Sequence, residues 1–235
     1  MIDLHTHLLP RIDDGSSSLE LTLELLKKAE EVGVTDLMFT SHYARFRHFM
    51  PTRKMTRTLF EEVSSAVKEE GININLYLGS EIDYDDSLFE WLDGEIVRTL
   101  GSKYVLLDFG FKKYEVDDVI YELVVRGYKP IIAHPERYRY VSGVDELKKW
   151  RKTGALLQVN ASSMFRNHHT KKQFKLMLKH ELIDFVCSDV HRHKEAYDHM
   201  LKVKDHMEKK CDKDYVKRVF ETNPKKVLDA YVEQL

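Results

Sequence analysis

The sequence predicts an α/β protein built on a parallel sheet, and three observations lead to this fold class. Seven apolar, β-branched runs alternate with amphipathic helical patterns along the 235 residues. No internal repeat, low-complexity tract or Gly/Ser/Pro linker divides the chain, so one domain is expected, at a length that α/β barrels often reach. The alternation alone leaves two arrangements open, a closed barrel or an open, doubly wound sheet.

The runs that predict strands are short and rich in Val, Ile, Leu, Phe and Tyr, as strands buried on both faces usually are. They span residues 1–4, 34–40, 73–79, 103–108, 130–133, 155–159 and 184–187. In a parallel sheet the carboxyl ends of the strands meet at one edge, and active sites lie there in both arrangements. The ends of these runs are therefore the expected location of an active site.

The first helical pattern begins after Ser17 or Ser18, either of which can cap it, and Gly33 can end it in a left-handed conformation. Further helical patterns cover residues 55–70, 115–126, 144–153, 171–181 and 194–210. Two short helices are expected to close the chain. The last of them starts at Asn223-Pro224, with proline at its first position.

Composition excludes several classes of protein. The formal net charge of -2 gives no electrostatic case for binding nucleic acid or an anionic membrane. No apolar run approaches the ~18 residues of a membrane span, and Asp3 and His5 lie where a signal peptide would need apolar residues. Cys187 and Cys211 do not make a disulfide framework, so a reducing cytoplasm is the expected compartment.

Side chains that commonly bind metals lie at the ends of six of the seven predicted strands. His5 and His7 are two residues apart on an extended strand, so their imidazoles point the same way. Asp189 and His191 repeat this spacing after the last strand. The candidates in chain order are His5, His7, Asp14, His42, Glu81, Asp108, His134, Asp189 and His191. If the strands are parallel, all of these side chains converge on one edge of the sheet.

Each of these elements taken alone has a simpler explanation. A His-x-His pair arises easily by chance in a chain with 12 histidines, and Asp-Asp-Gly is usually a turn. A single histidine or glutamate is more often a surface residue, and Asp108 can be a helix cap or a buried hydrogen-bond acceptor. The coincidence at the strand ends therefore carries the prediction. The remaining histidines are expected to be solvated: His48, His168, His169, His180, His193, His199 and His206.

The mixture of imidazole and carboxylate ligands, without thiolate, suits Zn, Mn or Fe. So many ligands suit two or three divalent ions, in which a bridging carboxylate holds neighbouring ions ~3.5–4 Å apart. Three divalent ions would bring six positive charges, and Asp14, Glu81, Asp108 and Asp189 bring four negative ones. The remaining two positive charges match a phosphate dianion. Hydrolysis of a phosphate ester by attack of metal-bound hydroxide is therefore predicted.

Two other kinds of site lack the residues that they need. A cysteine-dependent phosphatase needs an arginine six residues after its nucleophile, but His193 follows Cys187 at this distance and Lys217 follows Cys211. No Gly-rich loop follows any predicted strand, so a nucleotide-binding fold lacks its phosphate-binding signature.

Nearly the whole chain resembles the PHP (polymerase and histidinol phosphatase) superfamily, and more narrowly its capsule-locus branch of bacterial tyrosine-protein phosphatases. The opening Met-Ile-Asp-Leu-His-Thr-His, the Asp-Asp-Gly turn and the Ala-His-Pro-Glu-Arg-Tyr segment carry this resemblance. The other matching positions are Ser41-His42, Gly79, Glu81-Ile82, Asp108-Phe109, Gln158-Val159-Asn160, Ser162, Ser188-Asp189, His191, Asn223-Pro224 and Lys226. The Asp-Asp-Gly and His-x-Glu-Arg-Tyr elements separate this branch from histidinol phosphatases.

The resemblance implies a distorted (β/α)7 barrel, a single PHP domain over residues 1–235, with three metal ions. It assigns His5, His7, Glu81 and Asp189 to one ion, Glu81, Asp108 and His134 to a second, and Asp14, His42 and His191 to a third. Arg137 would bind the phosphate oxygens as a bidentate donor, a role that suits a planar guanidinium. The implied substrate is phosphotyrosine on the cytoplasmic tail of a tyrosine kinase that controls capsule or exopolysaccharide synthesis and export.

The chain departs from the family pattern at two places. Glutamate is usual where Asp108 stands, and aspartate is one methylene shorter, so loose binding of the second ion or a shifted strand is expected. The family's second arginine follows the Asp-x-His motif, and here Arg192 is the candidate to replace it. The aromatic and basic loop over residues 43–49 either stacks on a phosphotyrosine ring or is a mobile surface loop.

Three functions are compatible with these residues. The first is a metal-dependent protein-tyrosine phosphatase, and the second is a small-molecule phosphomonoesterase such as histidinol phosphatase. The third is a non-catalytic, metal-bound module, which is disfavoured because every ligand position holds a competent residue. The sequence leaves open the identity and number of the metals, the partner kinase and the oligomeric state.

Overall fold

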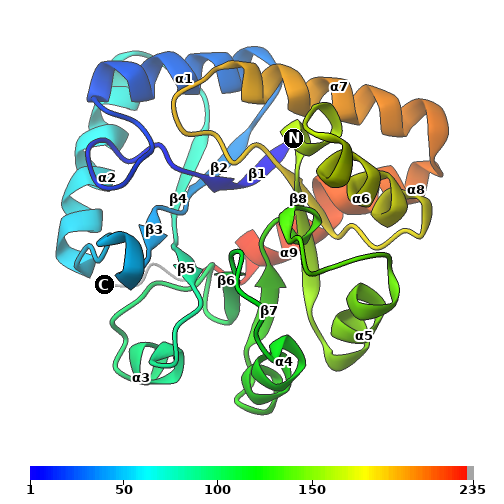
Figure 1. Ribbon diagram of the computed structural model, residues 1–235. Helices are drawn as coiled ribbons and strands as arrows, with labels where there is room; N and C mark the ends of the chain where they lie inside the picture. The colour runs from blue at the N-terminus through cyan, green and yellow to red at the C-terminus, as the bar shows by residue number, and fades with distance from the viewer. Residues whose placement is uncertain (232–235) are drawn as a thin grey trace.

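The computed structural model describes residues 1–231 and has the expected parallel sheet, curled into a ring with helices around its outside (Figure 1). Neighbouring strands pair in parallel around this ring. The strands are β1 (Ile2–Thr6), β2 (Asp36–Phe39), β3 (His42–Tyr43), β4 (Asn75–Leu78), β5 (Glu81–Asp83), β6 (Tyr104–Asp108), β7 (Lys129–Ile132), β8 (Leu156–Asn160) and β9 (Phe185–Cys187).

Consecutive strand segments follow one another around the ring in chain order. A three-stranded sheet, β1-β2-β4, leads into a six-stranded sheet, β3-β5-β6-β7-β8-β9, because the chain of β2 goes on into β3 and that of β4 into β5. The ring closes beside β1, where the His7 N–H donates to the Val190 carbonyl over 2.9 Å and the Asp189 N–H to the His5 carbonyl over 3.0 Å. The strand order never reverses, so the distorted (β/α)7 barrel is confirmed and the open, doubly wound alternative is wrong.

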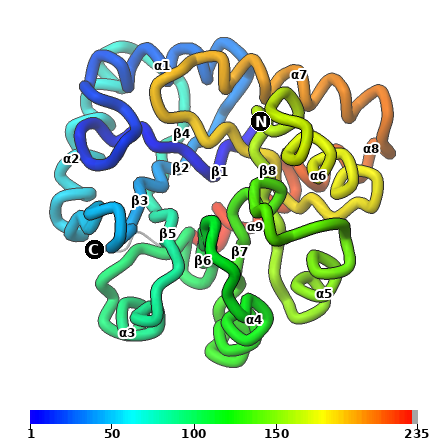
Figure 2. The backbone as a smooth tube through the Cα atoms, in the orientation of Figure 1, coloured from blue at the N-terminus to red at the C-terminus, as the bar shows by residue number. Residues whose placement is uncertain are grey.

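In the described part of the chain, six helices lie between strands in sequence and three follow β9, and most of them cover the outside of the ring. They are α1 (Leu19–Glu31), α2 (Arg53–Glu69), α3 (Leu88–Asp93), α4 (Val116–Val125), α5 (Asp145–Thr153), α6 (His168–Lys179), α7 (Glu195–Lys210), α8 (Lys213–Lys217) and α9 (Asn223–Asp229). Helices α1 and α7, from opposite parts of the chain, lie side by side (Figure 2), and the Lys28–Asp198 ion pair of 3.0 Å joins them. Among residues 1–231, no helix combines the length and apolar character that a membrane crossing requires.

Local signals at the first helix act as expected. The Ser18 hydroxyl, rather than that of Ser17, caps α1 by accepting a hydrogen bond from the Leu21 N–H over 3.2 Å. Gly33 follows the helix with a φ of +86°, the left-handed conformation that glycine adopts without a steric penalty.

Two predicted strands differ from the structure in a way that matters for the site. The runs over 34–40 and 73–79 each end early, and the chain then forms the separate short strands β3 and β5. At the second break, a Cβ on Gly79 would lie 2.5 Å from a Leu100 methyl carbon and 3.1 Å from the Met38 sulfur. Only glycine fits this close approach, and the break delivers His42 and Glu81 to adjacent positions on paired strands.

Other differences are local. Helix α3 was not expected, because six residues are too few to establish a helical period, although Leu88, Trp91 and Leu92 are buried. The short 3-10 helices η1 (Arg45–Arg47), η2 (Pro135–Arg137) and η3 (Ala161–Phe165) also lack a sequence signal. Between α8 and α9, the π-helical segment η4 (Arg218–Thr222) joins the two expected closing helices.

An apolar cluster lies directly below the polar ends of the strands. It includes Leu106 of β6, Ile131 of β7 and Phe185 of β9, all nearly inaccessible to solvent. Glu81 is the register partner of Leu106, and Gln158 is that of Phe185, so these polar residues share a sheet face with the cluster. The close-packed core therefore fixes the positions of the polar side chains above it.

Candidate metal centre

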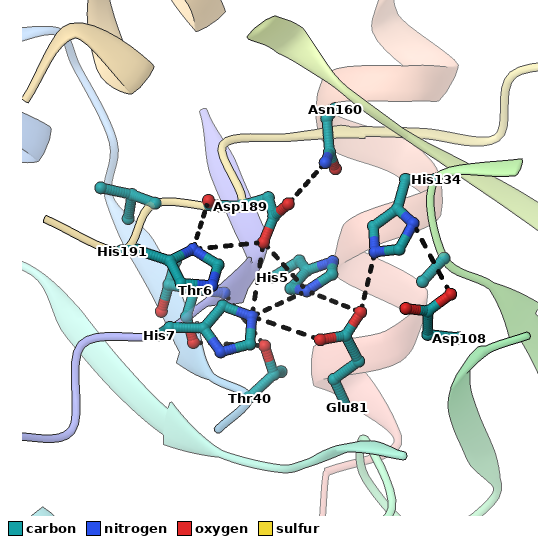
Figure 3. Close-up of polar contacts among 12 residues, drawn as sticks. His5, Thr6, His7, Thr40, Glu81, Asp108, His134, Asn160, Asp189 and His191 are labelled. Carbon is teal, nitrogen blue, oxygen red and sulfur yellow. Dashed lines mark hydrogen bonds and ion pairs between the residues drawn. The ribbon is translucent and has the colours of Figure 1, made fainter. Parts of the chain in front are cut away.

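The structure brings the nine predicted metal-binding residues together at one end of the ring; Figure 3 shows His5, His7, Glu81, Asp108, His134, Asp189 and His191 pointing toward a common centre. Three sets of ligand atoms each lie within 4.8 Å of one another. The sets are His7, Asp14, His42 and His191; His5, Glu81 and His134; and His5, His7 and Asp189. Asp108 lies beside the second set, with its Oδ1 atom 3.9 Å from His134 Nδ1.

His5 and His7 on β1 are held in fixed orientations by neighbours outside the predicted set. His5 Nδ1–H donates to the side-chain oxygen of Gln158 over 3.1 Å, and His7 Nδ1–H donates to Asp13 Oδ2 over 2.9 Å. Each ring therefore directs Nε2 at the centre, and the two Nε2 atoms are 3.2 Å apart. In the neutral rings these atoms carry facing lone pairs, which a shared cation would satisfy.

Negative charge converges on the same point. Oxygens of the Glu81 carboxylate lie 3.3 Å from Nε2 of His5 and of His7, and Asp189 Oδ1 lies 3.5 Å and 3.4 Å from the same atoms. Burial opposes ionisation, but the adjacent histidines in their protonated form, His5 foremost, hold the pKa of both carboxyl groups well below the usual range. Two buried carboxylates with converging acceptors form a site that a divalent cation suits.

Glu81 occupies the middle of the cluster. Beyond the two histidines of β1, its Oε1 atom lies 2.9 Å from His134 Nε2, and its Oε2 atom lies 2.9 Å from His42 Nδ1. One carboxylate thus faces histidines from β1, β3 and the end of β7. A carboxylate in this position is able to bridge two ions, as the sequence predicts for Glu81.

Asp108 ends β6 and is held by neighbours other than the proposed ligands. Its Oδ1 atom accepts hydrogen bonds from the Tyr138 hydroxyl over 3.1 Å and from the Gly110 N–H over 2.7 Å. The Tyr138 hydroxyl in turn accepts from the Phe109 N–H over 2.9 Å. These bonds fix the shorter carboxylate at the edge of the cluster.

A third group of ligands lies toward the solvent. His191 Nδ1–H donates to the Asp189 carbonyl over 3.0 Å, so its Nε2 faces Asp14 Oδ1 at 3.5 Å. His42 Nε2 lies 3.4 Å from the same oxygen. The guanidinium of Arg47 contacts this group, because it donates to Asp14 Oδ2 over 2.5 Å and approaches His42 Nε2 to 2.9 Å. A cationic side chain therefore already contacts two of the predicted ligands.

Arg137 stands at the end of η2, directly after β7. It donates from Nη1 to Asp189 Oδ2 over 3.2 Å, and the Asn160 amide donates to the same oxygen over 2.5 Å. These two donors turn the other Asp189 oxygen toward His5 and His7. Arg137 also lines the open pocket above the cluster.

Two of the predicted ligands have an unusual backbone. His134 has a φ of 34° and Asp189 a φ of 51°, both in the left-handed region that side chains with a Cβ rarely adopt. Each follows a buried strand, and the turn aims its side chain back over the ring. Such strain costs of order 1–3 kcal/mol per residue and typically occurs at functional sites.

The pocket above the cluster has a volume of about 530 Å3. Asp14, His42, Arg137 and Arg192 line it. Arg192 donates from Nε to the carbonyls of Asp14 and Gly15 over 3.1 Å and 2.8 Å, so it braces the loop that carries Asp14. A role for Arg192 toward a bound phosphate stays a prediction.

Of the seven histidines expected to be solvated, four are exposed, namely His48, His168, His180 and His193, whereas His169, His199 and His206 are half-buried. His193 and His199 line the pocket, and the His199 ring stacks on Phe165 with centroids 4.6 Å apart. His169 is half-buried, and its Nε2–H donates to the Tyr138 carbonyl over 3.4 Å. These residues lie at the starts of helices that face the strand ends, which a polar segment in the sequence does not reveal.

The sequence prediction also missed the residues that position the ligands. Gln158 and Asn160 share one face of β8, and an alternating pattern of polar residues was the available signal. Asp13 and Asp14 are adjacent and have different partners. Asp13 accepts a hydrogen bond from His7, and Asp14 lies beside His42 and His191. Asp3 is fully buried and accepts from the Ser188 N–H over 3.1 Å, and burial raises its pKa to about 6.

The donor set fits divalent cations. Glu81 Oε2, Asp14 Oδ1 and His134 Nδ1 are buried atoms without a hydrogen-bond partner. An unsatisfied buried polar atom usually costs about 1–3 kcal/mol, which cation binding would recover. Carboxylate and imidazole donors in this proportion suit Mn, Fe or Zn.

The nearby cysteine does not offer a competing chemistry. Cys187 ends β9 and is only 1% exposed. Burial raises the pKa of its thiol well above the ordinary value, so the thiolate that acts as a nucleophile is disfavoured. The structure thus agrees with the absence of a cysteine-dependent phosphatase motif.

Two solved structures share this fold. A crystal structure described as YwqE from Bacillus subtilis and CpsB from Streptococcus pneumoniae, unique metal-dependent tyrosine phosphatases, superposes with a TM-score of 0.88 over 99% of this chain and 96% of that chain, at 23% identity. Histidinol phosphate phosphatase from Lactococcus lactis, complexed with zinc, L-histidinol and phosphate, matches with a TM-score of 0.55 at 13% identity, over 86% of this chain and 92% of that one. Both likenesses establish the shared fold.

Sequence relatives are more specific. The chain is 36% identical over 199 residues to a Staphylococcus aureus protein that carries the provisional name tyrosine-protein phosphatase CapC. The match covers 81% of this chain and 77% of that protein. It is 26% identical over 239 residues to tyrosine-protein phosphatase CpsB of Streptococcus pneumoniae, covering 97% and 98%. The family model for capsular polysaccharide synthesis, CpsB/CapC, matches residues 1–229. The resemblance stated from the motifs is thereby confirmed, and the chain belongs to the CpsB/CapC family of capsular polysaccharide synthesis proteins.

Proposed function

We propose that this chain is a metal-dependent protein-tyrosine phosphatase, a phosphoric monoester hydrolase whose catalytic domain spans residues 1–235. The observation that carries the proposal is the convergence of carboxylates and histidines from both ends of the chain on one open pocket with an arginine at its wall. Relatives named as tyrosine-protein phosphatases support the choice of phosphotyrosine as substrate.

The proposed ligands follow the three sets of atoms. His5, His7, Glu81 and Asp189 would hold one ion, Glu81, Asp108 and His134 a second, and Asp14, His42 and His191 a third. Two or three ions of Mn, Fe or Zn are expected. Bound cations of this kind neutralise the charge of a phosphate ester and activate water as the nucleophile.

The chain's own residues would bind and orient the ester. Arg137 presents a planar guanidinium at the pocket wall, and its Nη1 contact with Asp189 fixes the plane of that group. A phosphate oxygen pair would accept from the guanidinium edge, which aligns phosphorus over the cluster. Asp13 and Gln158 keep the histidine rings of β1 in the required tautomer.

The proposed biological substrate is a phosphotyrosine on the cytoplasmic tail of a tyrosine kinase that regulates capsule or exopolysaccharide synthesis. Membership of a capsular polysaccharide synthesis family supports this choice. Such a substrate would place the enzyme in the cytoplasm.

A direct comparison of substrates tests the proposal. We expect metal-loaded protein to hydrolyse a phosphotyrosyl peptide with a higher kcat/KM than histidinol phosphate. The opposite ranking would establish a small-molecule phosphomonoesterase instead. The structural likeness to histidinol phosphate phosphatase is the reason to test this alternative. No turnover of either ester with Mn, Fe or Zn would contradict both and leave a non-catalytic module.

The role of Arg137 has its own test. Arg137→Ala removes the proposed phosphate donor, and a charge-assisted hydrogen bond is worth about 1.5–3 kcal/mol, so kcat/KM should fall roughly 10- to 100-fold. The side chain is partly exposed, and Asn160 still holds Asp189, so the melting temperature should change little. Steady-state kinetics and a thermal melt decide this; an unchanged kcat/KM would remove Arg137 from the mechanism.

A further inference from the structure

A second pocket of about 560 Å3 adjoins the pocket above the metal centre. Arg137 and Arg166 line both pockets, so the two form one continuous groove across the surface. The second pocket extends the groove to Arg139, His169 and Phe111, which come from the η2 turn, α6 and the loop after β6. None of the residues that form the function proposed above, apart from Arg137, lies in this extension.

The extension carries positive charge without a partner. Among residues 1–231, no acidic side chain lines it. Among the arginines of residues 1–231, only the guanidinium groups of Arg139 and Arg166 make neither an ion pair nor a hydrogen bond. The chain has 39 acidic and 37 basic residues, so carboxylates are abundant elsewhere, and their absence here is a local property of the groove.

Other exposed arginines have the acidic partners that Arg139 and Arg166 lack. Arg45 pairs with Asp85 over 3.2 Å, and Arg126 pairs with Asp93 over 2.9 Å. Two unpaired guanidinium groups that line one pocket raise the local positive potential, which favours an incoming anion. An exposed aromatic ring, Phe111 with 79% of its surface accessible, lies at the same groove and offers an apolar contact.

We propose that the groove formed by Arg139, Arg166 and Phe111 binds acidic side chains that flank the phosphotyrosine in a peptide substrate. This inference rests on the proposed phosphatase function. When the phosphate reaches Arg137 at the junction of the two pockets, the peptide on one side of the phosphotyrosine must leave along the surface. The groove begins at that junction, and its charge is complementary to aspartate and glutamate.

The backbone indicates how far along the peptide the acidic residue lies. Tyr138 is extended, with φ -72° and ψ 116°, so the Cα atoms of Arg137 and Arg139 are separated by about 7 Å, the span of two extended residues. An acidic residue within a few positions of the phosphotyrosine would therefore be able to reach Arg139. Arg166 follows η3 and allows contact with a residue farther along.

The experiment compares pairs of phosphotyrosyl peptides that differ only by Glu or Gln, with the substitution placed in turn at each of the nearest positions on both sides. For the wild-type enzyme we expect kcat/KM for the best Glu peptide to exceed that for its Gln partner about three- to tenfold, as two exposed ion pairs would give. The preference should weaken as ionic strength rises. The ratio within one enzyme cancels any general change of activity.

Variants assign the preference to the groove. R139Q combined with R166Q should bring the Glu/Gln ratio close to one, whereas K171Q combined with K175Q, on the exposed part of α6, should keep it. The charge reversal R139E with R166E should favour a Lys peptide over the Glu peptide, which a merely structural role cannot produce. Thermal melts confirm that each variant folds.

The outcomes separate this inference from the proposed function. Hydrolysis of Glu and Gln peptides at equal rates by the wild type would overturn the groove and leave the phosphatase intact. A preference that survives R139Q with R166Q would also overturn it. Failure to hydrolyse any phosphotyrosyl peptide would overturn both proposals.

Discussion

Single side chains outside the predicted ligand set decide which atoms face the metal centre. Gln158 accepts from His5, and Asp13 accepts from His7, so both rings present Nε2. The sequence predicted His5 and His7 from their spacing alone, because strand periodicity puts residues two apart on one face. It did not predict the roles of Gln158 and Asp13, since these roles depend on contacts between β8, the Asp-Asp-Gly turn and β1 that only the closed ring creates.

His42→Ala and His191→Ala test the outer ligands. We expect either change to abolish phosphatase activity and to lower the melting temperature by only a few degrees, because both residues lie above the apolar cluster. Turnover of a phosphotyrosyl peptide and a thermal melt are the measurements. Near-normal turnover by either variant would contradict the assignment of the third ion.

Arg47→Met tests whether the guanidinium competes with a cation. Arg47 contacts Asp14 and His42, two proposed ligands of the third ion, so its removal should free them. We expect the weakest Mn site to tighten about three- to tenfold, the range for an exposed ion pair and its charge. Calorimetric titration with Mn and the metal content after dialysis measure this.

Arg45→Met is the matched control for Arg47, because it lies on the same turn but pairs with Asp85. Its Mn affinity should equal that of the wild type. Unchanged or weaker Mn binding by Arg47→Met would show that Arg47 does not occupy the ion's position.

At the scale of elements, the breaks in two strands build the site. The sequence predicted single strands over 34–40 and 73–79, but β3 and β5 form separately and pair His42 with Glu81. The prediction failed because Gly79 could be a weak strand residue or a point of close approach, and only the position of Leu100 decides between them. The strand ends themselves, and with them Asp108 and His134, were correctly located.

Gly79→Ala tests the importance of the break. The new methyl group would lie 2.5 Å from Leu100 and force the backbone apart, at a cost of about 1–3 kcal/mol. We expect the melting temperature to fall by roughly 2–10 °C for a chain of this size, with weaker metal binding through Glu81. Gly94→Ala, whose Cβ would approach no atom closer than 3.1 Å, should cost less. Equal melting temperatures for both variants would show that the close approach relaxes freely.

At the scale of the molecule, the ring brings buried carboxylates together, and the apolar core offers no positive charge to compensate them. Glu81 and Asp189 are held as buried anions, and buried ligand atoms lack partners. The sequence predicted the ring and the convergence of its strand ends, since alternating strands and helices leave few topologies. It did not predict the basic groove, because Arg139 and Arg166 are neighbours only after η2 and η3 pack together.

Removal of metal ions tests whether bound cations compensate these buried carboxylates. A bound ion at a hundredfold excess over its Kd stabilises a fold by about 2.7 kcal/mol, so chelation should lower the melting temperature by roughly 5–10 °C and abolish turnover. Restoring Mn, Fe or Zn should reverse both effects. Calorimetry before and after chelation gives the shift, and a melting temperature indifferent to chelator would argue against resident ions.

The contact between β1 and the segment after β9 sets the order in which the protein can mature. His5 and His7 are synthesised long before Asp189 and His191, the residues that complete the ring beside them. A nascent chain that has not yet reached Asp189 therefore carries only part of the proposed ligand set. If these residues bind metal as proposed, binding by the complete set must wait until Asp189 and His191 join the ring, and a product terminated before them would lack it.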